Sequence, residues 1–199
     1  DLAGNSNATY SANAFVVDTT APTTPVFLSP ASLVNSSSYS LSIQGELNST
    51  ILVKDNDTLV QTTALSTSPK SIALTLTEGT HSLTAQLKDS AGNLSPIATQ
   101  SVTVDITKPT ITRFTMATPS PVSANTYSIS LSFSETVDSS KSPTVVIKTQ
   151  AGQSRTVTLS SYSGTSAQGT VTFQSGDDGL STLQVSGVTD LAGNRNSLY

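Results

Sequence analysis

Acidic residues recur at matching places in a chain that carries little charge. The acids fall into two sets of three. In each set, the first acid precedes a Pro-bearing stretch and the second follows the second strand expected in its domain. The third acid is the Asp of an Asp-x-Ala-Gly-Asn motif. The first set is Asp18, Glu46 and Asp89, and the second is Asp105, Glu135 and Asp190. Because strand direction alternates in an antiparallel fold, these three places are expected at the same end of each domain.

Carboxylates gathered at one end of a domain repel one another unless a cation or hydrogen bonds compensate them. Calcium suits such a site because it is a hard ion that takes about six to eight oxygen ligands in flexible geometry. The two sets therefore predict calcium sites at the domain junctions, where a bound ion would fix the angle between neighbouring domains.

A structural reading of the same motifs is compatible with calcium binding. In Asp-x-Ala-Gly-Asn, Asp89 and Asp190 hydrogen-bond their own turns, and Gly92 and Gly193 supply positive φ angles. In this reading the following asparagines, Asn93 and Asn194, cap the loops.

Three further places carry residues that could do chemistry, and each favours a structural role. Residues 176–179 (GDDG) are too short for a helix–loop–helix calcium site and favour a hairpin turn, as do residues 55–57 (DND). His81 is the only histidine and stands at the start of an expected strand, which favours a structural role over a Ser-His-Asp triad. No phosphate-binding loop or zinc spacing is present, so we expect no enzyme activity.

Composition excludes several classes of protein. The 199 residues suffice for two domains, the net charge is −4, and charged residues make up 11%. The basic residues are scattered, so no nucleic acid is expected as a partner. No apolar run approaches the length of a bilayer span, so no membrane insertion is expected. The absence of cysteine excludes thiol catalysis.

Hydrophobic residues alternate with Ser and Thr, which is typical of half-buried strands. Tyr127, Ile129, Leu131 and Phe133, for example, alternate with serines. The predicted strands lie near 25–28, 39–44, 49–54, 58–63, 70–76, 81–88, 99–104, 111–117, 126–133, 144–149, 154–160, 169–174 and 180–187. This pattern predicts an all-β fold of tandem immunoglobulin-like β-sandwiches.

Internal repeats divide the chain. Residues 1–10 (DLAGNSNATY) closely match residues 190–199 (DLAGNRNSLY), which indicates one turn of a larger repeat of about 189 residues. We expect residues 1–18 to be the final strand of a preceding or partner repeat, 19–106 to be domain 1, and 107–199 to be domain 2 without its last strand.

The strand predicted at residues 9–17 therefore has no domain before it. Two readings remain open. The parent chain continues at both ends, or residues 9–17 of one copy complete domain 2 of another copy and form a head-to-tail fibre.

Several motifs in order resemble a known family. Gly45-Glu46-Leu47, ILVKDND, TEGTHSLTAQLKDSAGN and VTVDITKP resemble the bacterial immunoglobulin-like (Big) tandem repeats of large cell-surface adhesins and biofilm-associated proteins, over residues 19–109. LSFSETVD, TVVIK and VSGVTDLAGN resemble a related class, with Thr136 where proline is usual. The resemblance implies an extracellular stalk on a bacterial cell surface, often stiffened by calcium at domain junctions.

The expected function is a structural stalk or spacer whose partners are neighbouring repeats of the same protein. Pro22, Pro25 and Pro109 would stiffen the joints by fixing φ. The alternatives are an adhesion module that binds a glycan or host protein, and a strand-donating subunit of a fibre. Few aromatic residues, 5% of the chain and no Trp, disfavour the binding module.

Overall fold

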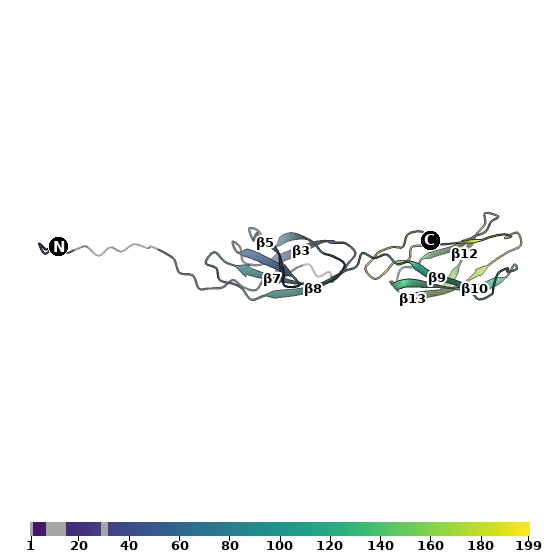
Figure 1. Ribbon diagram of the computed structural model, residues 1–199, viewed down its shortest axis with the longest axis horizontal. Coiled ribbons are helices and arrows are strands. Elements are labelled where there is room, and N and C mark those ends of the chain that lie inside the picture. The colour runs from purple at the N-terminus through teal and green to yellow at the C-terminus, as the bar shows by residue number, and fades with distance from the viewer. Residues whose placement is uncertain (1, 7–14, 29–31) are drawn as a thin grey trace. The chain divides into compact units, whose positions relative to one another are not determined.

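The computed structural model describes residues 2–6, 15–28 and 32–199, and this part of the chain is all-β (Figure 1). No helix occurs among these residues, and thus none that is long and apolar enough to cross a bilayer. The expected all-β class is confirmed.

The strands are short and closely spaced. Their bounds are β1 Val26–Phe27, β2 Leu33–Val34, β3 Ser38–Gln44, β4 Thr50–Asp55, β5 Thr58–Ala64, β6 Lys70–Thr75, β7 Gly79–Lys88, β8 Ala98–Val104, β9 Ile111–Met116, β10 Thr126–Val137, β11 Thr144–Lys148, β12 Ser154–Thr156, β13 Thr158–Thr172 and β14 Thr182–Ser186.

The strands form four sheets, an arrangement consistent with β-sandwich packing. Their orders are β1-β3-β6, β2-β8-β7-β4-β5, β13-β10-β9 and β12-β11-β14. The pairings of β1 with β3, β4 with β5 and β7, β10 with β9 and β13, and β11 with β12 and β14 are antiparallel, and that of β2 with β8 is parallel.

The chain divides into two compact units, each built from several segments. Unit 1 consists of Asp1–Pro30, Ser40–Leu74 and Ser82–Ser101, and unit 2 consists of Ala31–Tyr39, Thr75–His81 and Val102–Tyr199. The domain boundaries expected after residues 18 and 106 stay predictions.

Alternation along the strands produces the buried layers. In β7, His81, Leu83, Ala85 and Leu87 are buried while their neighbours face outward or are half-buried. In β10, Ile129, Leu131 and Phe133 join a hydrophobic core of unit 2 that also includes Val145 of β11. A strand with one apolar face reaches this arrangement directly, because successive side chains point to opposite faces.

The strand expected near 154–160 covers β12 and the start of β13, and the strand expected near 169–174 overlaps the end of β13, which doubles back on itself. Gly164 has a φ angle of +57°, and the Ser160 hydroxyl donates a hydrogen bond to the carbonyl oxygen of Gln168. The early part of β13 therefore lies against its later part, and this later part pairs with β10.

The structure differs from the expected strands at two other places, β2 and residues 15–17. The two-residue strand β2 was not expected, because no alternation is readable over two residues. Of the strand expected at 9–17, residues 9–14 lie outside the described residues, and residues 15–17 are described without strand pairing.

Candidate metal centre

The two Asp-x-Ala-Gly-Asn motifs fold into the same hydrogen-bonded turn. In the second, Asp190 Oδ1 accepts from the backbone N–H of Gly193 at 2.7 Å and of Asn194 at 2.8 Å. In the first, Asp89 Oδ1 accepts from the backbone N–H of Asn93 at 2.8 Å. Gly92 and Gly193 both have φ angles of +98°, a conformation that favours glycine. The predicted turn role of these motifs is confirmed.

The side-chain amide of the asparagine in each turn also donates a hydrogen bond to the backbone of the aspartate that precedes the Pro-bearing stretch, Asp105 or Asp18. Asn194 Nδ2 donates to Asp190 Oδ2 at 2.7 Å and to the carbonyl oxygen of Asp105 at 2.8 Å. Asn93 Nδ2 donates to Asp89 Oδ2 at 2.8 Å and to the carbonyl oxygen of Asp18 at 3.1 Å. These bridges extend the expected capping role, because each joins a turn to a segment that is distant in sequence.

The structure brings the second predicted set of acids together. Asp105 follows β8, Glu135 lies in β10, and Asp190 opens the turn after β14. One carboxylate oxygen from each lies within 4.8 Å of the others, and all three residues belong to unit 2. Asp190 is only 1% exposed. Three acids so close in a partly buried place disfavour one another's ionised forms.

Glu135 is the least satisfied member of this group. Its Oε1 atom is buried and has no hydrogen-bond partner in the described part of the chain. Burial, followed by repulsion from Asp190, Asp105 and Glu78, raises the pKa of the Glu135 carboxyl. The nearby Glu78 accepts a hydrogen bond from the Thr107 hydroxyl at 2.6 Å. Nothing in the sequence pattern indicated Glu78, whose proximity depends on the tertiary fold.

The other two acids of the group are partly engaged. Asp105 Oδ1 accepts from the backbone N–H of Thr107 at 3.1 Å, as Asp18 Oδ1 accepts from that of Thr20 at 3.0 Å. A carboxylate has about four lone-pair sites, so these bonds leave acceptor capacity at Asp105 and Asp190.

The first predicted set is arranged differently. Among residues 2–6, 15–28 and 32–199, the only group of three ligating side chains within ligand distance is that of Asp105, Glu135 and Asp190. Asp18 and Asp89 both contact Asn93, and Asn93 lowers the pKa of the Asp89 carboxyl by hydrogen bonding. Glu46 is exposed, and its backbone oxygen accepts from the Ser49 hydroxyl at 2.6 Å.

The donor set at Asp105, Glu135 and Asp190 fits a hard cation. All three donors are carboxylate oxygens, which calcium and magnesium prefer, whereas zinc prefers nitrogen and sulfur. The unpartnered Oε1 of Glu135 is the type of atom that a cation would satisfy. Calcium accommodates irregular geometry better than magnesium, which demands near-octahedral ligands.

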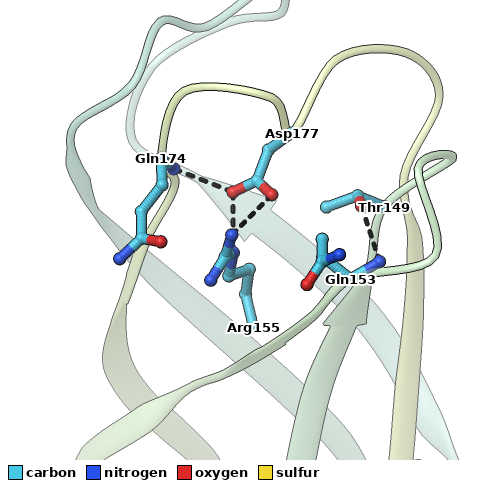
Figure 2. Close-up of polar contacts among 5 residues, drawn as sticks. All are labelled: Thr149, Gln153, Arg155, Gln174 and Asp177. Atoms are coloured by element: carbon cyan, nitrogen blue, oxygen red, sulfur yellow. Dashed lines mark hydrogen bonds and ion pairs between the residues drawn. The ribbon is translucent and has the colours of Figure 1, made fainter.

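The loop at residues 176–179 is a turn held by an ion pair (Figure 2). Arg155 donates to Asp177 through Nε at 2.7 Å and Nη2 at 2.8 Å, and the backbone N–H of Gln174 donates to Asp177 Oδ2 at 2.8 Å. These bonds, the arginine first, lower the pKa of the Asp177 carboxyl. A bidentate pair of this type is geometrically specific. The hairpin predicted at residues 176–179 is wrong, because this loop joins β13 to β14 and these two strands belong to different sheets. Arg155 was not predicted, because it is distant in the chain.

The hairpin turn predicted at residues 55–57 is confirmed, and His81 makes a contact of the structural kind. Asn56 and Asp57 join β4 to β5 with φ angles of +46° and +67°, which is the conformation of a two-residue hairpin turn. His81 is 5% exposed, and its Nε2 lies 2.9 Å from the carbonyl oxygen of Thr77.

Comparison of the chain with protein-family models gives no match, and comparison with curated protein sequences gives none either.

Proposed function

We propose that this chain is a stalk or spacer segment of a repetitive bacterial surface protein, built of tandem immunoglobulin-like repeats and located outside the cell. Calcium at Asp105, Glu135 and Asp190 stiffens it. The observation that carries this proposal is the convergence of three carboxylates from three distant parts of the chain. The internal repeats, the low charge and the family resemblance of the motifs support the repetitive surface protein.

The position of Asp105 explains why a cation there would stiffen the chain. Asp105 directly follows β8, and Lys108 and Pro109 lead on to β9. A cation shared with Glu135 and Asp190 would tie this connecting segment to β10 and to the turn after β14. The segment would then lose conformational freedom, because the Asp105 carboxylate would be held by the cation as well as by the backbone N–H of Thr107.

The first test is thermal unfolding of the whole chain with calcium and with excess chelator. Calcium is expected to raise the melting temperature, because a ligand that binds only the folded state adds about 2.7 kcal/mol at a hundredfold excess over its Kd. Glu135→Gln should abolish this rise. The matched control is Glu46→Gln, in the set whose carboxylates are not within ligand distance, and it should keep the full rise.

Small-angle X-ray scattering of the same samples tests the stalk. Calcium should narrow the distribution of interatomic distances for the original chain and leave that of the Glu135→Gln variant unchanged. An equal calcium effect on the original chain and Glu135→Gln would show that the ion binds elsewhere, and no effect on either would remove calcium from the proposal.

A further inference from the structure

The strand β5 forms one edge of the five-stranded sheet, next to β4, and no strand lies on its other side in the described part of the chain. Its seven residues are exposed except for Thr63, which is half-buried, and Leu59 and Val60 are 54% and 42% exposed. No charged residue occurs in the range 58–69. An exposed, uncharged edge strand can pair with a strand of another chain, because its outward backbone groups are free to accept one.

Several other outer strands of the described sheets have features that oppose such pairing. The strands β1 and β2 have two residues each, β6 begins with Lys70, and β9 carries Arg113. Short length and charged side chains are the usual protections of a sheet edge. Neither applies to β5, which has seven uncharged residues.

A β-bulge at Val60 limits the regular part of β5. The register of β5 against β4 shifts between Val53 and Lys54, so that Val60 has no residue opposite it. Such a bulge interrupts the ladder and bends the strand. Residues 61–64 pair regularly with β4, so a second strand is expected to pair regularly only beside this part.

The hydrogen bond of Leu65 shows which backbone groups face outward. Its N–H donates to the carbonyl oxygen of Ser49, directly before β4, at 2.8 Å. Alternate residues of an antiparallel ladder bond to the same neighbour, so Thr63 also faces β4. The backbone N–H and carbonyl groups of Thr62 and Ala64 therefore point to the open side of the sheet.

We propose that β5 pairs with β5 of a second copy of this chain, antiparallel and about a two-fold axis at Thr63. Thr62 of one copy then lies opposite Ala64 of the other, and these two residues exchange both of their backbone hydrogen bonds. This is the one register in which the whole segment 61–65 pairs with itself. The contact is isologous, because both copies contribute the same surface.

The charges that flank β5 favour a second copy in this orientation. Asp57 directly precedes the strand, and Lys70 is the first charged residue after it. Antiparallel pairing places the acidic start of one strand beside the end of the other, from which Lys70 follows. Parallel pairing would place the two Asp57 residues together. Opposite charges across an interface favour the matching partner and orientation.

The contact is short, so the association is expected to be weak. A stable protein–protein interface buries about 1,200–2,000 Å² in total, more than one strand edge of this length supplies. We therefore expect dissociation constants of about 1 μM to 1 mM. The contact uses neither Asp105, Glu135 nor Asp190, so it stands independently of calcium and of the stalk proposed above.

Sedimentation of the full chain in chelator, up to about 1 mM, measures this association. The mass of the original chain should rise with concentration. Thr62→Pro removes an outward N–H and should stay monomeric, whereas Thr62→Val, the matched control, keeps this N–H and should associate like the original chain. The melting temperatures of both variants in dilute solution show whether the proline variant is folded.

A charge exchange at Thr62 tests the same contact without changing the backbone. The two Thr62 side chains lie diagonally across the axis on one face of the sheet, so Thr62→Lys alone and Thr62→Glu alone should each associate several-fold more weakly than the original chain. An equal mixture of these variants should associate at least as strongly as the original chain. A mixture that associates no better than either variant alone overturns pairing at β5.

Amide hydrogen exchange identifies the strand that pairs. The N–H groups of Thr62 and Ala64 should exchange quickly in dilute solution and slowly at concentrations where the mass has risen, whereas that of Thr63 should be protected in both. Protection that appears at another outer strand instead overturns β5 as the surface. An original chain that stays monomeric throughout the concentration range overturns the second copy as the partner.

Discussion

Asn194 joins the turn after β14 to the segment after β8. It is 8% exposed, and its side-chain amide donates to the buried Asp190 carboxylate and to the backbone of Asp105. Asn194→Ala removes both bonds and leaves a carboxylate that is 1% exposed with fewer donors. We expect a loss of about 2 kcal/mol in the free energy of unfolding, measured by urea denaturation, because a hydrogen bond to a charged group contributes about 1.5–3 kcal/mol.

Asn93→Ala is the matched control for that change. Asn93 makes the corresponding bonds in the first turn, but its surroundings are more exposed, so water replaces the lost donor more easily. An equal loss for both variants would contradict the role assigned to burial.

The raised pKa of Glu135 makes the free energy of unfolding depend on pH in a direction that can be stated. Burial and the neighbouring carboxylates raise its pKa in the folded chain, so the folded state keeps this proton to a higher pH than the unfolded state does. Without calcium, the contribution of Glu135 to stability therefore falls as pH rises from about 4.5, its ordinary pKa, through the raised value.

Glu135→Gln removes this titration. In chelator, the variant is expected to gain stability relative to the original chain as pH rises from 4 to 7, and the measurement is the difference between the two urea-unfolding curves at each pH. A difference that is constant across this range would show that Glu135 titrates alike in both states.

At the scale of strands, Gly169 is the position where a side chain is least tolerated. A Cβ atom there would lie 2.5 Å from the carbonyl oxygen of Thr158 and 3.0 Å from the Cα of Leu159, both within the doubled-back β13. Because backbone atoms cannot swing aside, we expect Gly169→Ala to lower the free energy of unfolding by about 1–3 kcal/mol in urea denaturation.

Gly45→Ala is the control for Gly169→Ala, because the added Cβ atom would meet side-chain atoms rather than backbone atoms. Its Cβ would lie 2.7 Å from the Cδ1 atom of Leu87, the far end of a side chain that has other rotamers. The loss should be smaller than for Gly169→Ala, and a larger one would show that the Leu87 packing cannot adjust.

Strand prediction succeeded where alternation was long enough to read. Ile129, Leu131 and Phe133 are buried in β10 as their spacing indicates. The doubling back of β13 is centred on Gly164, and no apolar pattern marks it because residues 160–166 are mostly Ser, Thr and Gly. Local sequence therefore specified the strands, and tertiary contacts decided how the polar stretches between them fold.

At the scale of the whole molecule, the repeated order of acids was enough to predict which residues meet in the second set. Asp105, Glu135 and Asp190 converge because strand direction and turn position follow from the strand pattern. The same order did not bring Asp18, Glu46 and Asp89 within ligand distance, since Glu46 stands exposed in its loop. The contribution of Glu78 to the electrostatics of Glu135, and the pairing of Arg155 with Asp177, involve partners that only the folded chain brings near.

The parallel pairing of β2 with β8 has a mechanical consequence. Leu33 lies opposite Thr103 and Val34 opposite Val104, and backbone N–H groups of Thr103 and Asp105 donate to the carbonyl oxygens of Ser32 and Val34. A pull on the chain before β2 and after β8 would load these bonds in shear, all at once, whereas a pull across an antiparallel end would open such bonds one at a time. Under tension, the force needed to extend this segment is therefore set by the whole short ladder rather than by its weakest bond.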